Sequence, residues 1–160
     1  ASLWKLPVLY IIENNKYGMG TSVDRAAAGS DLYKRGKPFG IPGELVDGMN
    51  VFKVIEAAHK AGKYVREGKG PYILEVQTYR YKGHSMSDPA KYRTKKELEL
   101  YKTKDPIQIA HKEILQKKIA TEKELEKINK EIIKKIKNAA DYALKSPFPN
   151  NEDLYTDVYV

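Results

Sequence analysis

Cysteine is absent from the 160 residues of this chain, and long apolar runs are absent as well. Without cysteine there is no disulfide, no thiolate metal ligand and no cysteine nucleophile, which is typical of proteins from a reducing compartment. The longest apolar stretch, Leu6 to Ile12, is much shorter than the roughly 20 residues that span a bilayer. No basic segment followed by an apolar core opens the chain, so we expect neither a secretory signal nor a membrane partner.

The composition is that of a globular domain, with 41% hydrophobic and 31% charged residues. The formal net charge is +8, which raises nucleic acid as a partner. Most of the excess lies between Lys91 and Lys137, where 15 Lys and Arg residues stand among 8 Asp and Glu residues. Such mixing is typical of solvated helix faces, so we expect no nucleic-acid binding. A non-catalytic basic helical interaction module stays as an alternative.

The first half of the chain alternates strand and helix signals. Residues Pro7–Glu13 predict a strand buried on both faces, Glu44–Asp47 a short strand and Pro71–Gln77 a second core strand. Asn50 is a suitable N-cap for a helix with an apolar stripe, and Gly68 a suitable end. Strand, helix and strand in this order predict an α/β fold with a parallel sheet flanked by helices.

Two loops follow the predicted strands. Residues 18–43 are rich in glycine and predict an irregular loop with one helical turn near residues 25–28. Residues 78–97 form a second loop that is polar, basic and aromatic. Because ligands of α/β proteins bind at the carboxyl ends of parallel strands, we expect active-site loops over residues 16–43 and 78–97.

The second half predicts helices. Asp105 with Pro106 resembles a helix start, and Thr121 with Glu124 forms a capping box. After it runs an apolar stripe, which predicts a helix packed on its parent domain or a short coiled-coil seam. Its members are Leu125, Ile128, Ile132, Ile136, Ala139 and Ala143. We assign residues 1–97 to a partial α/β core and 98–160 to a helical region with an extended C-terminal tail of the same domain.

The number of predicted strands is small for a parallel sheet, which needs both faces and both edges covered. We therefore expect the N-terminal half of the fold to precede Ala1. We also expect an exposed sheet edge, and hence self-association of the isolated chain.

The first polar loop opens with ENNKYGMG, residues 13–20. An asparagine side chain offers a neutral oxygen, and glycines let backbone carbonyls approach a hard cation such as Mg²⁺. Asparagine pairs are also common in ordinary turns, so spacing alone leaves both interpretations open.

The second polar loop contains His84, preceded by the segment Tyr79–Lys82 and followed by Arg93. A basic, aromatic loop of this kind suits a phosphate-rich ligand, and histidine can donate to phosphate or move a proton. His59 and His111 lie in predicted helices, and we interpret them as structural.

Four segments, LWKLP…ENNKYGMGTS, GIPGELVDGMN, QTYRYKGHSMSDPAKYRT and LYTDVYV, resemble the α subunits of pyruvate dehydrogenase E1 components. These belong to the thiamine-diphosphate-dependent 2-oxo acid dehydrogenases. The resemblance implies the C-terminal part of a thiamine-diphosphate-binding fold. It implies oxidative decarboxylation of pyruvate with acetyl transfer to the lipoyl domain of the E2 component. A branched-chain 2-oxo acid or acetoin dehydrogenase is the alternative.

The resemblance also implies an E1 β subunit as partner in an α2β2 heterotetramer, and bacterial cytoplasm or mitochondrial matrix as location. By this resemblance, the side-chain oxygen of Asn15 and the backbone carbonyl of Tyr17 bind Mg²⁺. These two residues and His84 bind thiamine diphosphate, and His84 is catalytic. Ser22 and Ser85 match serines that are phosphorylated in mitochondrial members. Because an acidic half of the metal motif would precede Ala1, we expect no activity from this chain alone.

Overall fold

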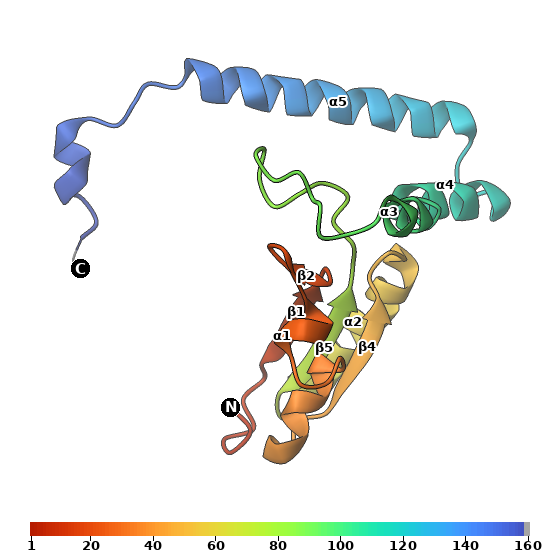
Figure 1. Cartoon of the computed structure of the whole chain (residues 1–160), viewed down its shortest axis with the longest axis vertical. Coiled ribbons are helices and arrows are strands. Elements are labelled where there is room, and N and C mark those ends of the chain that lie inside the picture. The colour runs from red at the N-terminus through yellow and green to blue at the C-terminus, as the bar shows by residue number, and fades with distance from the viewer. Residues whose placement is uncertain (159–160) are drawn as a thin grey trace. The chain divides into compact units, whose positions relative to one another are not determined.

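The computed structural model describes residues 1–158. The chain divides into two compact units, Ala1–Glu113 and Ile114–Val160. Figure 1 shows the elements along the chain. The first unit contains β1 (Leu9–Asn14), β2 (Tyr17–Gly18), β3 (Thr21–Ser22), α1 (Val23–Ala26), the 3-10 helix η1 (Leu32–Phe39), β4 (Gly43–Asp47), α2 (Val51–Arg66), β5 (Tyr72–Gln77) and α3 (Lys95–Lys102). Helix α4 (Pro106–Gln116) crosses the boundary, and α5 (Glu122–Lys145) and the 3-10 helix η2 (Asn151–Tyr155) follow.

The central feature of the first unit is a three-stranded parallel sheet in the order β1-β5-β4. This confirms the predicted α/β fold. Strand β5 lies in the middle, where Leu74 is 1% exposed and Glu75 0%. Strand β1 lies at an edge and pairs only with β5 among the described residues, so Ile11 is 62% exposed. The prediction that β1 is buried on both faces is therefore wrong.

Helix α2 packs on one face of the sheet through two small apolar clusters. Val46 and Leu74 contact Ala57 in one, and Tyr72 contacts Ala61 and Val65 in the other. Alanines at the contact positions allow the helix to approach the strands closely, which favours dense packing. The stripe predicted for this helix, Val51, Val54, Ile55, Ala58 and Val65, is confirmed only in part, because Val51 and Ile55 are exposed while Ala57 and Ala61 are buried instead.

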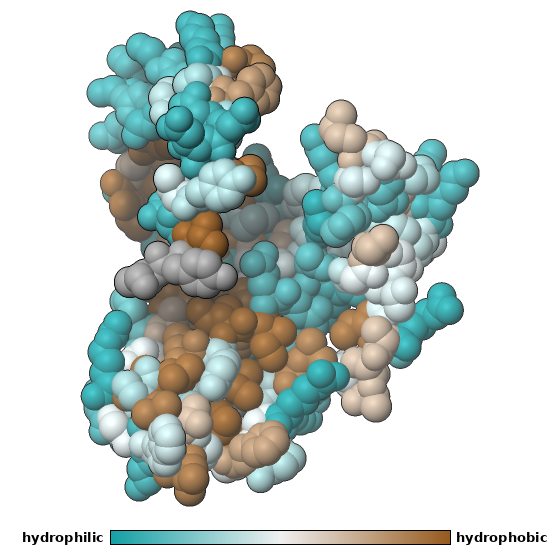
Figure 2. Space-filling model, turned by 90° about the vertical axis from the view of Figure 1, so that its left-hand side faces the viewer, coloured by the Kyte–Doolittle hydropathy of each residue, from teal (hydrophilic) through white to brown (hydrophobic). Residues whose placement is uncertain are grey.

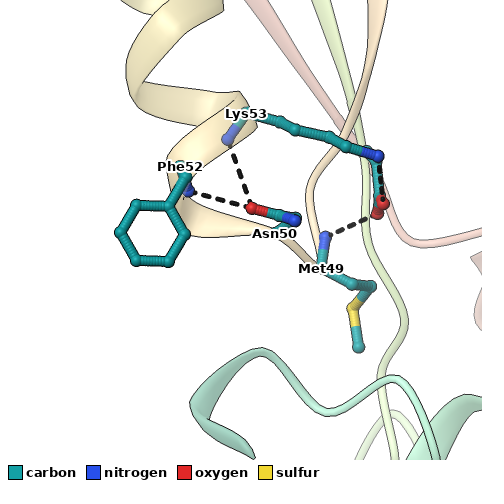
Figure 3. Close-up of polar contacts among 5 residues, drawn as sticks. Met49, Asn50, Phe52 and Lys53 are labelled. Carbon is teal, nitrogen blue, oxygen red and sulfur yellow. Dashed lines mark hydrogen bonds and ion pairs between the residues drawn. The ribbon is translucent and has the colours of Figure 1, made fainter. Parts of the chain in front are cut away.

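The start of α2 follows the predicted cap closely (Figure 3). The Asn50 side chain accepts hydrogen bonds from the backbone N–H of Phe52 at 3.1 Å and of Lys53 at 3.3 Å. These bonds satisfy two of the N–H groups that every helix start leaves without an internal partner. The helix ends before Gly68, whose φ of 71° is readily adopted only by glycine.

The loop over residues 18–43 contains more structure than its composition predicts. The expected helical turn is present as α1, close to residues 25–28. The hairpin β2–β3 and the eight-residue η1 were not predicted. Helix η1 is held by a contact distant in sequence, because the N–H of Tyr33 donates to the Glu75 carboxylate at 2.9 Å. Local composition carries no signal of such a contact.

The caps of the later helices are confirmed. Asp105 Oδ1 accepts from the N–H groups of Ile107 at 2.9 Å and Gln108 at 3.2 Å. The Thr121 N–H donates to Glu124 Oε2 at 2.7 Å, and the Glu124 N–H returns a bond to Thr121 Oγ1. No residue of α5 is buried. Where an extended tail was expected, η2 forms a short 3-10 helix, and residues 159–160 lie outside the described part.

Apolar side chains gather in the lower half of the face that Figure 2 shows, where Figure 1 draws the sheet. Exposed apolar residues of the first unit include Trp4, Tyr10, Ile11, Phe39 and Leu45. Among the described residues, no helix combines the length and the apolar character that crossing a membrane requires.

Candidate functional site

The two predicted active-site loops begin side by side. Strands β1 and β5 are parallel and in register, so that Asn14 stands opposite Gln77 at their carboxyl ends. The N–H of Thr78 donates to the Asn14 carbonyl at 2.9 Å, which joins the first residues of the two loops. The sheet therefore brings together segments more than 60 residues apart in the sequence.

The two asparagines have different surroundings. Asn14 is buried, and its side chain donates to Glu75 Oε1 at 2.8 Å and accepts from the Lys16 N–H at 3.0 Å. Asn15 is half-buried, and its side-chain oxygen accepts one bond, from the Tyr17 N–H at 3.3 Å. An amide oxygen has two lone pairs, so the Asn15 oxygen retains one for a ligand. Asn14 thus holds the turn, and the Asn15 side-chain oxygen keeps one acceptor position open among the described contacts.

Three tyrosines, Tyr17, Tyr79 and Tyr101, connect the two loops to helix α3. The Tyr17 hydroxyl donates to the Glu97 carboxylate at 3.0 Å, and the Tyr79 hydroxyl donates to it at 3.1 Å. The ring of Tyr79 stacks on Tyr101 with centroids 3.9 Å apart. Burial, and then the hydrogen bond to Glu97, raise the pKa of Tyr17 to about 12. Tyr17 is therefore a neutral hydrogen-bond donor at physiological pH.

His84 is exposed, and its backbone rather than its ring is tightly held. Its N–H donates to Asp88 Oδ2 at 2.6 Å, and its carbonyl accepts from Arg80 at 3.0 Å. The Arg80 guanidinium lies 3.5 Å from Nδ1 of the imidazole. The His84 amide, followed by the Ala90 amide and the Tyr92 hydroxyl, lowers the pKa of Asp88. The imidazole is thus presented to solvent by a loop that hydrogen bonds stabilise.

Arg93 closes the base of the same loop. Its guanidinium donates to the carbonyls of Arg80 and Tyr81. It also lies over the ring of Tyr79, 5.3 Å from the centroid, and over that of Tyr92, at 6.0 Å. Cation–π contacts with two rings and hydrogen bonds to two carbonyls fix this side chain. One positive charge is thereby held at the loop base.

The predicted site residues meet at one pocket. Asn15, Tyr17 and His84 line it together with Arg80, Lys82 and Arg93. Beside it, residues 80–98 surround an open hollow of about 600 Å³, which His84 and Ser85 also line. Ser22 lines neither hollow; it pairs with Tyr17 in the β2–β3 hairpin. Asn15, Tyr17 and His84 thus share one pocket, Ser85 lines the hollow beside it, and Ser22 contacts the site only through its pairing with Tyr17.

The residues at this pocket can be compared with the groups that bind a diphosphate and Mg²⁺. The pocket itself is small, about 10 Å³, but its three cationic side chains also line the adjoining hollow of about 600 Å³, where guanidinium and ammonium donors suit a diphosphate. Mg²⁺ requires six oxygens in octahedral geometry, often including substrate phosphate and water. The described residues contain no cluster of three or more His, Asp or Glu that could hold a metal. Asn15 and Tyr17 fit as two of the six ligands.

Two residues of this site were missed from the sequence. Glu75 holds Asn14 and Tyr33, and Glu97 holds Tyr17 and Tyr79. A signal for Glu75 exists, because a charged residue inside the apolar run PYILEVQ requires partners. Glu97 gives no such signal, since Tyr17 is 80 residues away in the chain.

Comparisons with known proteins agree with this geometry. A family model described as "Dehydrogenase E1 component" matches residues 1–152. The chain is 53% identical over 159 residues to the pyruvate dehydrogenase E1 component subunit alpha of Rickettsia felis, covering 99% of this chain and 49% of the relative. For the protein of the same name from Rhizobium meliloti, identity is 53% and the coverage 99% and 46%.

A mitochondrial relative is similar too. The chain is 50% identical over 161 residues to the mitochondrial pyruvate dehydrogenase E1 component subunit alpha of Sminthopsis macroura, covering 99% of this chain and 44% of the relative. The chain thus spans about half the length of the curated relatives it matches.

Proposed function

This chain belongs to the dehydrogenase E1 component family, and on that premise we propose that it works in the α subunit of a pyruvate dehydrogenase E1 component. The observation that carries the proposal is the pocket at which Asn15, Tyr17 and His84 meet three cationic side chains. The substrate would be pyruvate, because the relatives named above are pyruvate dehydrogenase subunits. A branched-chain 2-oxo acid or acetoin is the alternative substrate.

The proposed cofactors are thiamine diphosphate and Mg²⁺. When bound, thiamine diphosphate supplies the electron sink for the loss of CO2 from pyruvate and for transfer of the acetyl group to lipoamide. Asn15 would give its free side-chain lone pair to Mg²⁺, and Tyr17 its backbone carbonyl. Arg80, Lys82 and Arg93 would neutralise the diphosphate. Phosphate oxygens and water would be among the remaining ligands of the metal.

His84 would act at the reacting end of the site. Its ring is exposed at the pocket while its backbone is held by Asp88 and Arg80. An imidazole with a fixed backbone can donate a hydrogen bond to a phosphate or substrate oxygen, or carry a proton. The nearby Arg80 guanidinium stabilises negative charge on the same oxygen. We therefore assign His84 as the catalytic residue of this chain.

The proposed assembly is an α2β2 heterotetramer with E1 β subunits, which delivers acetyl groups to the lipoyl domain of E2. The proposed location is the bacterial cytoplasm, as for the bacterial relatives, with the mitochondrial matrix as the alternative. Phosphate on Ser85 would place a charge of about −1.5 to −2 beside His84 and the hollow it lines. Ser22 is the second proposed phosphorylation position.

The test is calorimetric titration of thiamine diphosphate with Mg²⁺ into this chain alone, and into the chain extended upstream of Ala1 and mixed with an E1 β subunit. We expect binding in the mixture, and a roughly tenfold to hundredfold weaker affinity for Asn15→Ala or His84→Ala. His59→Ala, an exposed change on α2, is the matched control and should bind as the native chain does. Absence of binding in every mixture would contradict the proposal.

A further inference from the structure

We propose that Glu97 is a positioning residue, whose single carboxylate sets the distance between the Asn15 loop and the His84 loop. This inference rests on the function proposed above. Glu97 is the last residue of the predicted second loop, but the structure places it on α3, and it makes no described hydrogen bond to Asn15 or His84. Its effect on the site would pass through two tyrosines.

The carboxylate holds one tyrosine from each loop. Glu97 Oε1 accepts from the Tyr17 hydroxyl at 3.0 Å and from the Tyr79 hydroxyl at 3.1 Å, and Oε2 lies 3.1 Å from the Tyr17 hydroxyl. Tyr17 belongs to the turn that presents Asn15. Tyr79 directly precedes Arg80, which holds the His84 carbonyl. One acceptor thus connects the two halves of the pocket.

Helix α3 holds the carboxylate itself in place. Glu97 is the third residue of α3, and its N–H donates to the capping side chain of Thr94 at 3.1 Å. Tyr101, one turn later, stacks on Tyr79 at 3.9 Å with an interplanar angle of 5°. The second loop therefore contacts α3 twice, and the helix acts as a rigid mount for the acceptor.

The negative charge of the carboxylate strengthens the hydrogen bonds that it accepts. Two hydroxyl donors converge on one half-buried group, and an ionised carboxylate accepts at both oxygens. Glutamine keeps one oxygen that can accept both hydroxyls but loses the negative charge that strengthens the two hydrogen bonds. Alanine leaves both hydroxyls without this partner. The three side chains therefore form a graded series for the connection.

The arrangement separates the two loops experimentally. Tyr17→Phe removes the bond to the Asn15 loop and leaves the Tyr79 bond, whereas Tyr79→Phe does the reverse. Glu97→Ala removes both. A residue that merely stabilised α3 would change neither loop selectively. Glu99 provides the control, because it lies on the same helix and its carboxylate binds Lys102 at 2.8 Å.

The first measurement is limited proteolysis of the chain without ligand, with cleavage sites identified by mass spectrometry. We expect Glu97→Ala to raise cleavage in both loops at least roughly tenfold, since local opening follows the loss of local contacts. Glu97→Gln should be intermediate. Tyr17→Phe should open only the first loop and Tyr79→Phe only the second. Unchanged cleavage in Glu97→Ala would overturn the inference.

The second measurement is calorimetric titration of Mg²⁺ with thiamine diphosphate into each variant, made in the chain extended upstream of Ala1 and mixed with an E1 β subunit. We expect Glu97→Ala to weaken binding roughly tenfold or more, and Glu99→Ala to bind like the native chain. If the native chain binds the cofactor and Glu97→Ala binds it with the same affinity, the positioning role is overturned. Open loops in Glu97→Ala with no binding by the native chain would instead overturn the proposed function and support the connection through Glu97.

Discussion

Strand β5 and the loop that follows it are continuous in sequence and opposite in character. Residues 72–75 are buried, and Leu74 contacts α2 and β4 residues in the core. Residues 78–94 are largely exposed, and their order comes from hydrogen bonds of Arg80, Asp88 and Arg93. Burial fixes the position of the loop's first residue, and polar contacts fix its path. The site is thus a polar loop mounted on an apolar strand.

The strand and the loop should therefore respond differently to substitutions and to pH. Apolar burial is insensitive to pH and depends on shape, so β5 should respond to changes in side-chain volume. The loop depends on charged hydrogen bonds near solvent, so it should respond to charge and pH without loss of the core. The predictions below run from the strand to the loop.

Leu74→Ala should have the largest effect. Leu74 is 1% exposed at the centre of the sheet, so truncation removes buried methyl groups and leaves a cavity. We expect a loss of about 2–5 kcal/mol in the free energy of unfolding, measured by urea denaturation with circular dichroism. Ile11→Ala, on the exposed edge strand, is the control and should cost clearly less. Equal losses would show that β1 is as well covered as β5.

Glu75→Ala tests the one charged residue in the strand. Its removal leaves the Asn14 amide and the Tyr33 N–H without their buried acceptor, at a cost of about 1–3 kcal/mol in the free energy of unfolding. Urea denaturation measures this loss, and hydrogen exchange at Tyr33 should accelerate. Glu13→Ala is the control, because that glutamate is exposed on β1. A neutral Glu75→Ala would show that water replaces the carboxylate.

Arg93→Ala moves the test to the loop. The change removes the donors to the Arg80 and Tyr81 carbonyls and the cation over two aromatic rings. We expect a loss of only about 1 kcal/mol in the free energy of unfolding, because water reaches the freed carbonyls. Protease cleavage at residues 80–90 should nevertheless increase strongly. Lys91→Ala, an exposed neighbour, should leave both measurements unchanged.

Elements whose signals are local were predictable from the sequence. The caps at Asn50, Asp105 and Thr121 involve residues two or three positions apart, and all three are confirmed. An exposed sheet edge was expected, but its location at β1 was not predictable, because an apolar run has the same pattern at the centre and at the edge of a sheet. Helix η1 was missed because its tie to Glu75 spans 42 residues.

The residues of the candidate site were also predictable only in part. The resemblance and the basic loop pointed to Asn15, Tyr17 and His84, and the structure places all three at one pocket. Their roles as ligands and catalyst stay predictions. Glu97 escaped because its function depends on two tyrosines that come together only in the fold. Motifs formed by neighbouring residues can be predicted from the sequence, whereas contacts between the two loops depend on how the sheet packs.

Mild acid should give the smallest and most local effect. The pKa of Asp88 is lowered by the amides of His84 and Ala90 and by the Tyr92 hydroxyl, which stabilise the carboxylate in the folded loop. Its contribution is therefore present above the ordinary pKa of 3.8 and is lost as the pH falls through the lower folded value. Below that value the protonated Asp88 accepts these bonds poorly, and the loop opens while the buried strand β5 stays folded.

Nuclear magnetic resonance can follow this transition from about pH 6 to about pH 2. The Ala90 amide, which donates to Asp88 Oδ1 at 2.8 Å, should shift with a midpoint below 3.8, and the Leu74 amide should not shift with it. In Asp88→Asn the Ala90 transition should vanish. A midpoint at or above 3.8 would mean that these bonds do not hold the ionised carboxylate. A Leu74 shift with the same midpoint would mean that strand and loop unfold together.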